Sequence, residues 1–458
     1  MGENRSAYAA SLLREHGKSL CFHREAQDFV SRPQPEICRR RLNVLLSAYA
    51  CAPYLGSEHG VGWQWAVALA RRGHEVWVIT QAKYQAGIER ALAQEPLPNL
   101  HLVYHAALRS ENWWKSSASK MHLYYLLWQA GAYFVARRLM RQQRFDIAHH
   151  VTWVSVRFPS FIGLLGIPFI FGPVAGGDYS PISLWRGLGF GVCVHEALRW
   201  ASNFWVRYSP LMNLTFFTAR RIFVTSEQTA ALLPGYAKAR SSILLGITAD
   251  RCTELLSRLP LRRRGAGAPF QVFFAGRFVP LKGMHFGLKA FARLHGEVAR
   301  AQLTMIGSGP MLRQWRDLAD TLGIGANVCW RGSMERMEFL RALADFDVLL
   351  FPSLHDSGGM VVMEAMAAGI PVVCLDVGGP GILVDKSCGF GIAATVPQQV
   401  VQGLADALCY LAREPGRRNE MGRNARERIA QVLNPSAHAA RMERLYQEIL
   451  EQHAIACA

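Results

Sequence analysis

Short apolar runs separated by amphipathic segments recur along most of the chain. Apolar runs of about four to eight residues predict buried strands, and they occur at residues 43–50, 75–80, 145–150, 168–172, 221–225, 270–275, 302–306, 327–330, 346–351 and 371–375. Between them, other segments favour helices, such as one at 63–72 that ends at Gly73. Strands that alternate with helices are typical of an α/β fold with parallel sheets.

The length of the chain predicts two domains. With 458 residues it exceeds one ordinary core, and two units of about 200 residues each are the simplest division. The segment 261–267, with three successive arginines before Gly-Ala-Gly, has the composition of a linker. We therefore expect a flexible basic extension at 1–41, a first domain at 42–260, a second domain at 261–435 and a terminal helical segment at 436–458.

Charge and composition narrow the partners and the compartment. A net charge of +17 indicates an anionic partner, which could be nucleic acid, a phosphorylated substrate or the inner membrane leaflet. The longest apolar stretch, 161–173, is broken by glycine and proline and is too short to span a bilayer. No secretory signal is expected. Ten cysteines without a C-x-x-C pair are interpreted as reduced thiols of a cytoplasmic protein.

Two acids and two glycines follow the apolar run that ends at residue 351. Asp356 precedes Gly358 and Gly359, and Glu364 lies on the helix that is expected next. Glycines allow backbone N–H groups to approach a ligand closely, and a helix N-terminus, here at Met360 and Val361, favours negative charge. Carboxylates accept hydrogen bonds from sugar hydroxyls. The segment therefore predicts a site for a sugar or phosphate; a plain turn with a solvated helix cap is the alternative.

A second candidate element follows the run at 270–275. Arg277 and Lys282 lie five residues apart on a loop that is bounded by glycines. Such a pair can flank a diphosphate, because arginine donates forked hydrogen bonds and lysine supplies a compact charge. Further turns begin at Gly307 and Ser308, after the run at 302–306, and at Arg331. Solvated surface cations are the alternative.

The first half offers weaker candidates. Gly56 and Ser57 open a glycine-rich loop expected at 56–62, and His149 and His150 end the run at 145–150. Open α/β sheets bind ligands at the carboxyl ends of their strands. Without a G-x-G-x-x-G after the first strand, a nicotinamide cofactor is not expected. Paired histidines that pack in the core are the alternative.

Two segments of the first half are both aromatic and basic, at 112–144 and 185–207. At helical spacing these residues would form an apolar face that ends in cations, which suits the surface of an anionic membrane. Core packing with a solvated basic end explains them equally well.

Four motifs of the second half together resemble a known family. They are the acids eight residues apart, followed by Glu364-Ala365-Met366-Ala367 and by Gly369-Ile370-Pro371-Val372; the G-R-x-x-x-x-K-G loop at 276–283; the G-x-G-P turn at 307–310; and Arg331-Gly332. This order resembles the retaining GT-B glycosyltransferases of family 4, also called glycosyltransferase group 1. The first half, from about residue 43, is similar only loosely, through Gly56-Ser57-Glu58 and Gly73-His74-Glu75-Val76.

The resemblance implies a fold and an activity. The fold would be two Rossmann-like doubly wound domains that face each other across a cleft, with the helix at 436–453 crossing back to the first domain. The activity would be transfer of a sugar, with retained configuration and without a metal or other cofactor, from a UDP- or GDP-linked donor. The acceptor would be a glycan or a lipid-linked precursor, and the anionic inner membrane face a possible surface of contact.

The resemblance also implies roles for single residues. Glu364 would hold the ribose and Asp356 the hydroxyls of the donor sugar, while Arg277 and Lys282 would clamp the diphosphate. One of the two histidines His149 and His150 would lie near the sugar, and His150 is the preferred candidate. The remaining donor contacts would come from Gly56, Ser57, Gly307, Ser308, Arg331, Gly358, Gly359, Met360 and Val361.

Departures from the family pattern and rival functions remain. Asp356 stands where the family usually has glutamate, and Ser57 replaces a glycine. Asp345 and Asp347 form a D-x-D, but we do not expect a metal site there because they precede a buried strand. The rivals are an epimerase or phosphorylase on the same fold, and a basic membrane-surface or nucleic-acid-binding protein. No nucleic-acid-binding motif is present, so nucleic acid is not an expected partner.

Overall fold

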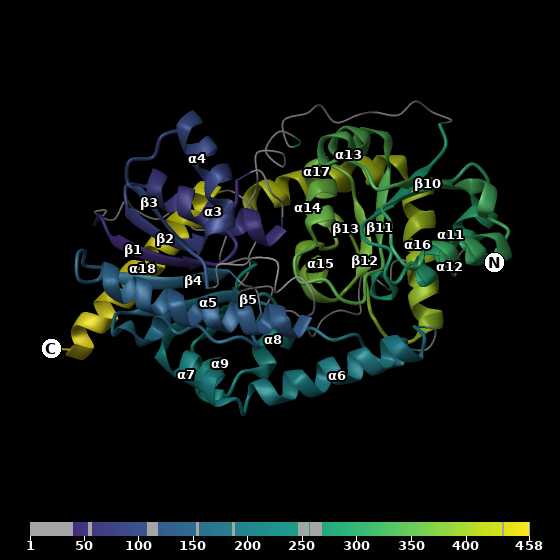
Figure 1. Ribbon diagram of the computed structural model, residues 1–458. Coiled ribbons are helices and arrows are strands. Elements are labelled where there is room, and N and C mark those ends of the chain that lie inside the picture. The colour runs from purple at the N-terminus through teal and green to yellow at the C-terminus, as the bar shows by residue number, and fades with distance from the viewer. Residues whose placement is uncertain are drawn as a thin grey trace.

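Two parallel sheets with flanking helices form the molecule (Figure 1). The computed structural model describes residues 40–53, 57–107, 118–152, 155–185, 188–245, 256, 268–432 and 435–457. The expected linker at 261–267 and nearly all of the expected extension at 1–41 lie outside these residues.

The first sheet has the strand order β3-β2-β1-β4-β5-β6-β7. Its strands are β1 (Asn43–Ala48), β2 (Glu75–Gln81), β3 (Leu100–His105), β4 (Ile147–Thr152), β5 (Phe169–Val174), β6 (Ala219–Val224) and β7 (Ser241–Ile243). Its helices are α3 (Ser57–Arg71), α4 (Gln85–Gln94), α5 (Ala118–Leu139), α6 (Phe190–Val206), α7 (Pro210–Thr218), α8 (Glu227–Leu232) and α9 (Gly235–Lys238), with short turns η1 (Ala82–Tyr84), η3 (Ile162–Leu165) and η4 (Ile182–Leu184).

The second sheet has the order β10-β9-β8-β11-β12-β13. Its strands are β8 (Gln271–Ala275), β9 (Gln302–Ile306), β10 (Val328–Gly332), β11 (Val348–Phe351), β12 (Val372–Leu375) and β13 (Gly389–Ile392). The helices are α11 (Met284–Glu297), α12 (Leu312–Thr321), α13 (Arg336–Ala342), α14 (Met360–Ala367), α15 (Gly378–Leu383), α16 (Pro397–Arg413), α17 (Pro415–Val432) and α18 (Pro435–Cys457), with short turns η5 (Pro280–Lys282), η6 (Gly325–Asn327) and η7 (Leu343–Asp345).

Alternation along the central strands explains why both faces of each sheet are covered. In β1, Leu45 packs with the aromatic residues of α5, whereas Val44 and Leu46 pack with α3 and α18. Strands that are buried on both faces read as continuous apolar runs, which is why the central strands were evident in the sequence. The edge strands β3 and β13 were not predicted, because an edge strand is partly exposed and needs no such run.

Two predicted boundaries in the first half are wrong. The expected loop is helical from Ser57 on, where α3 begins, and a Cβ on Gly62 would lie 2.2 Å from the Ala50 carbonyl oxygen. The glycines thus allow the helix to pack closely against the segment that follows β1. Strand β4 continues to Thr152, so the two histidines do not end it.

The last helix joins the two halves. From α17, next to the second sheet, α18 runs back to pack on α3 of the first half (Figure 1). Glu443 of α18, which is buried, pairs with Arg72 at the end of α3. Tyr446 donates or accepts a hydrogen bond of 2.6 Å with Nδ1 of His149.

The aromatic and basic segments have two different fates. In α5, Tyr124, Tyr125 and Trp128 are buried in the core, which agrees with core packing, the alternative to a membrane-facing surface. In α6, Trp200 and Trp205 are exposed instead. None of the described helices is both long and apolar enough to cross a membrane.

Candidate active site

The loops that follow the strands of the second sheet converge at its carboxyl edge. Phe278 N–H donates to the Ser308 carbonyl at 2.8 Å, and Gly307 N–H donates to the Gly332 carbonyl at 2.7 Å, so the loops after β8, β9 and β10 are joined. A Cβ on Gly307 would lie 1.9 Å from the Gly276 carbonyl oxygen, and its φ is +133°. Only glycine fits there without displacing the backbone.

Two cations lie on the loop after β8. Arg277 is exposed, and among the described residues it has no ion-pair or hydrogen-bond partner for its side chain. Lys282, which ends η5, pairs with the Asp356 carboxylate, and its Nζ lies 4.9 Å from the centre of the Phe351 ring. The loop after β8 is therefore joined to the loop after β11, with one cation engaged and the other facing solvent.

Asp356 organises the turn that leads into α14. Its Oδ1 accepts from the N–H groups of Gly358 at 3.2 Å and Gly359 at 2.8 Å. Burial raises the pKa of Asp356, but the Lys282 ammonium and the two backbone donors outweigh burial and hold the pKa below its ordinary value. The carboxylate therefore stays ionised. Gly359, at φ +61°, sits at the start of α14.

Glu364 lies one turn into α14 and is buried, with 3% of its surface exposed. Its Oε1 lies 2.9 Å from Nη1 of Arg336, at the start of α13. A buried carboxylate requires such a partner. Arg336 was missed by the sequence analysis, because no local pattern connects residues 28 positions apart.

The other predicted donor residues are placed as follows. Ser308 and Arg331 are exposed at the ends of β9 and β10, and Ser308 shares a 2.9 Å hydroxyl hydrogen bond with Ser333. Met360 and Val361 form the first turn of α14 and are partly exposed. Gly56 lies outside the described residues. Ser57 is the first residue of α3.

His149 and His150 are both buried, on opposite faces of β4. His149 is hydrogen bonded through Nδ1 to Tyr446 and through Nε2 to the Gly172 carbonyl, at 2.6 and 2.7 Å. His150 lies 3.4 Å from the Tyr125 hydroxyl and is 1% exposed. In this structure neither ring is accessible to a sugar, and their catalytic role stays a prediction.

A cluster of charged residues connects the two halves beside Asp356. Nη1 of Arg199, on α6, lies 2.9 Å from Nε2 of His355. Arg157, in the loop after β4, donates to Asn203 of α6 at 2.9 Å. Burial and the nearby arginine Arg199 lower the pKa of His355 to about 4, so the ring is neutral near pH 7 and can accept from Arg199.

Asp178 completes this cluster from the loop after β5. It is 2% exposed, and its Oδ1 accepts from the Ser226 hydroxyl. Burial raises the pKa of Asp178, and the nearby Asp356 acts in the same direction. Asp178 was not predicted as a site residue, although it directly follows the glycines at 176 and 177, which are the local signal for such a site.

Donors that suit an anion and acceptors that suit hydroxyl groups lie at the same edge of the second sheet. Lys282, Arg277 and the N–H groups at the start of α14 are donors for a phosphate, whereas Asp356 and Glu364 are acceptors. Among the described residues no group of three His, Cys, Asp or Glu side chains has metal-ligand geometry. Asp347 of the D-x-D accepts from Gln271 N–H at 2.8 Å, at the start of β8 and hence at the opposite edge of the sheet.

Comparison with known proteins places the chain in a family. Residues 263–428 match the family described as Glycosyl transferases group 1, and residues 60–241 match the Glycosyl transferase 4-like domain. A D-inositol 3-phosphate glycosyltransferase of Corynebacterium jeikeium is 30% identical over 239 residues, which are 49% of this chain and 56% of that protein. The chain spans about half the length of the curated relatives it matches.

Solved structures agree on the fold. Sucrose-phosphate synthase from Thermosynechococcus elongatus superposes with a TM-score of 0.55 at 18% identity, covering 90% of this chain and 100% of that one. Anabaena HepE, in complex with UDP and glucose, superposes with a TM-score of 0.52 at 16% identity, covering 88% and 99%. The chain belongs to the group 1 glycosyltransferases, and its fold is GT-B, with two Rossmann-like domains.

Proposed function

We propose that this protein is a glycosyltransferase that moves a sugar from a nucleotide-sugar donor to an acceptor. One observation carries the proposal: Arg277, Lys282, Asp356 and Glu364, far apart in the sequence, lie on loops and a helix at the same sheet edge of a family member. The donor is UDP- or GDP-linked, and the HepE neighbour, with UDP and glucose bound, supports a nucleotide-sugar donor.

The cations act on the leaving diphosphate. As the glycosidic bond breaks, negative charge grows on the diphosphate, and fixed donors stabilise it most effectively when they are already in place. Arg277 is free to swing onto a phosphate, since no partner holds it among the described residues. Lys282 bridges phosphate and Asp356, so that the same lysine orients the carboxylate toward the sugar hydroxyls.

The reaction retains the anomeric configuration, by attack on the face from which the diphosphate leaves. The alternative, a double displacement, needs an ionised carboxylate on the opposite face. Asp178, a carboxyl group of the first half, is close enough to Asp356 to interact with it electrostatically, and burial raises the pKa of Asp178. A raised pKa lowers the fraction of ionised carboxylate, the form that can attack, which favours the same-face route. The cations make a metal unnecessary.

The acceptor is a glycan or a lipid-linked precursor, bound by the first domain. Arg157, Arg199 and Asp178 project from that domain toward Asp356 and would meet an acceptor hydroxyl there. An epimerase or phosphorylase on the same fold remains the rival, and product analysis separates it: an epimerase returns an intact nucleotide sugar, whereas a transferase releases the nucleotide.

The test measures nucleotide release across a set of UDP- and GDP-sugars. Lys282→Ala and Glu364→Ala should each lower turnover by about a hundredfold or more, because each removes a group fixed at the donor site. Lys289→Ala, an exposed lysine on α11, is the matched control and should keep full turnover. Full turnover in Lys282→Ala or Glu364→Ala would remove that residue from the mechanism, and no release from any donor would refute the function.

A further inference from the structure

Helix α6 is amphipathic in the reverse sense to an ordinary surface helix. Its side toward the protein carries polar residues, with Glu196 1% and Asn203 2% exposed. Its outer side carries large apolar residues: Phe190 is 86%, Leu198 65% and Trp205 66% exposed. A surface helix normally buries its apolar stripe and shows its polar one to water.

Hydrogen bonds on the inner side fix this orientation. Arg199 contacts His355 of the second half, and Asn203 accepts from Arg157 at 2.9 Å and donates to the Gly177 carbonyl at 3.3 Å. A rotation of α6 that buried the apolar side would break all of these contacts. The exposure is thus built into the fold.

The apolar surface continues along the chain into α7. The rings of Trp200, Phe204 and Trp205 form one cluster with Tyr208, with neighbouring ring centres 5.4 to 6.5 Å apart. In α7, Phe217 is 74% exposed. We call Phe190, Leu198, Trp200, Phe204, Trp205 and Phe217 the outer aromatic face. A surface of this kind marks an interaction site.

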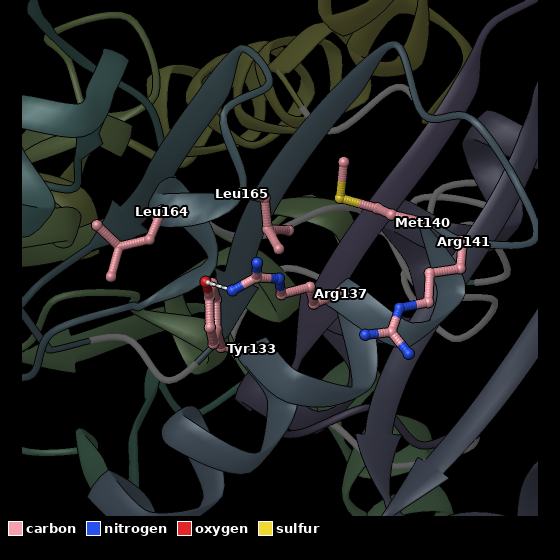
Figure 2. Close-up of a pocket in the computed structure, with 6 residues that line it drawn as sticks. All are labelled: Tyr133, Arg137, Met140, Arg141, Leu164 and Leu165. Atoms are coloured by element: carbon pink, nitrogen blue, oxygen red, sulfur yellow. Dashed lines mark hydrogen bonds between the residues drawn. The ribbon is translucent and has the colours of Figure 1, made fainter.

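A pocket with two arginines lies on the neighbouring elements (Figure 2). It has a volume of about 390 Å³ and lies between the end of α5 and η3, and η3 packs against both α5 and α7. Arg137 donates to the Tyr133 hydroxyl at 3.3 Å, and within the described residues neither Arg137 nor Arg141 pairs with an acid. The rest of the wall is apolar, formed by Met140, Leu164 and Leu165.

We propose that the outer aromatic face and the arginine pocket together dock the protein on the surface of an anionic lipid bilayer. Tryptophan and phenylalanine partition into the interfacial layer, and the arginines contact lipid phosphates at the same depth. The pocket suits one phospholipid, with the phosphate at Arg137 and Arg141 and an acyl chain against Leu164 and Leu165.

Charge decides for a membrane over a protein partner. Arg137, Arg138 and Arg141 are exposed at the end of α5, and the net charge is +17. An anionic leaflet attracts each such residue independently, whereas a protein interface depletes unpaired charge at its centre. In Figure 1, α6, α7 and α9 run along the lower side of the molecule with α5 above them, and η3 contacts both α5 and α7.

The docking has a consequence that rests on the proposed function. Arg199 joins the inner side of α6 to His355, next to Asp356, so the reaction site lies directly behind the docked helix. The acceptor would then be a lipid-linked molecule delivered from the bilayer rather than a soluble glycan.

Flotation with vesicles tests the docking independently of turnover. The full chain is mixed with phosphatidylcholine vesicles with or without about one quarter phosphatidylglycerol. We expect binding to the anionic vesicles that weakens with salt, and roughly tenfold weaker binding for Phe190→Ser/Trp205→Ser. Arg137→Gln/Arg141→Gln should weaken anionic binding by about fivefold per arginine.

Matched variants make the result specific. Ile455→Ser removes an apolar residue that is 78% exposed on α18, and Arg300→Gln/Arg313→Gln removes two exposed cations of the second half. Both should bind vesicles like the unchanged protein, and the docking variants should release nucleotide at the unchanged rate in solution.

Equal loss of vesicle binding in the control variants, or no vesicle binding by the unchanged protein, would overturn the proposal. So would a dimer without vesicles that Phe190→Ser/Trp205→Ser dissociates, since a second copy would then cover this face.

Discussion

The carboxyl edges of the two sheets differ in how their residues are held. At the second sheet, Gly283, Gly307 and Gly309 lie so close to a neighbouring backbone carbonyl that a Cβ would not fit, and the functional side chains follow within a few residues of a strand end. At the first sheet, the histidines of β4 are buried in the core, and Arg157, Asp178 and Arg199 reach the site from separate loops and a helix. A site built on tight local turns leaves a sequence pattern, whereas a site assembled from distant segments does not.

Among these variants, Gly307→Ala should have the largest effect, which is a loss of stability at the carboxyl edge of the second sheet. A Cβ would lie 1.9 Å from the Gly276 carbonyl, at a φ of +133° that alanine avoids, so we expect a loss of about 3 kcal/mol in the free energy of unfolding. Urea denaturation measures it. Gly296→Ala in α11, where a Cβ meets nothing within 4 Å, is the control and should be neutral or slightly stabilising. An equal effect in both would show that the turn is not tightly packed.

Arg199→Gln should affect the reaction with the acceptor and leave the reaction of the donor with water almost unchanged. It removes the cation between α6 and His355 and leaves the donor loops intact. We expect transfer to the acceptor to fall about tenfold to a hundredfold, or about 1.4 to 2.7 kcal/mol, while donor hydrolysis in water changes little. Steady-state kinetics with and without acceptor measure this. An equal fall in both reactions would mean that Arg199 serves the donor instead.

Tyr446→Phe asks whether His149 is structural. The variant removes the hydroxyl that bonds His149 Nδ1 at 2.6 Å in a fully buried place, so the free energy of unfolding should fall by about 1 to 2 kcal/mol. Turnover of the folded protein should be unchanged. If turnover is lost while stability is kept, His149 rather than His150 has the catalytic role.

His355 should make stability depend on pH in a defined window. Its pKa is lowered from 6.5 to about 4 in the folded state, so the unfolded chain binds the proton first as the pH falls. The contribution of His355 is therefore complete above about pH 6.5 and is lost toward pH 4, with an expected size of about 1 kcal/mol for this partly exposed ring. The measurement is the slope of the melting temperature against pH, compared between the unchanged protein and His355→Gln. Identical slopes would assign the dependence to other groups, such as His285, whose pKa burial also lowers to about 4.

Much of the fold was predictable because each central strand is buried on both faces and so carries its own apolar run. The family resemblance and the GT-B fold were confirmed by the family match and by the solved structures. They could be predicted because each motif consists of residues that are close along the chain. The ion pair of Lys282 with Asp356 spans two motifs that were each identified. Arg336 and Asp178 were not identified, because a buried acid's partner can come from any part of the chain.

By itself, the sequence determined the parallel α/β architecture, the glycine turns and the acids and cations of the second half, because periodicity and turn chemistry act between residues that are close along the chain. Only the tertiary structure decided that His149 and His150 are buried and that the inner side of α6 is its polar one. Both features depend on which distant segment packs against each side chain. Tyr446 of α18 forms a hydrogen bond with His149. Arg157 and His355 form hydrogen bonds with polar residues of α6, so its aromatic residues face outward.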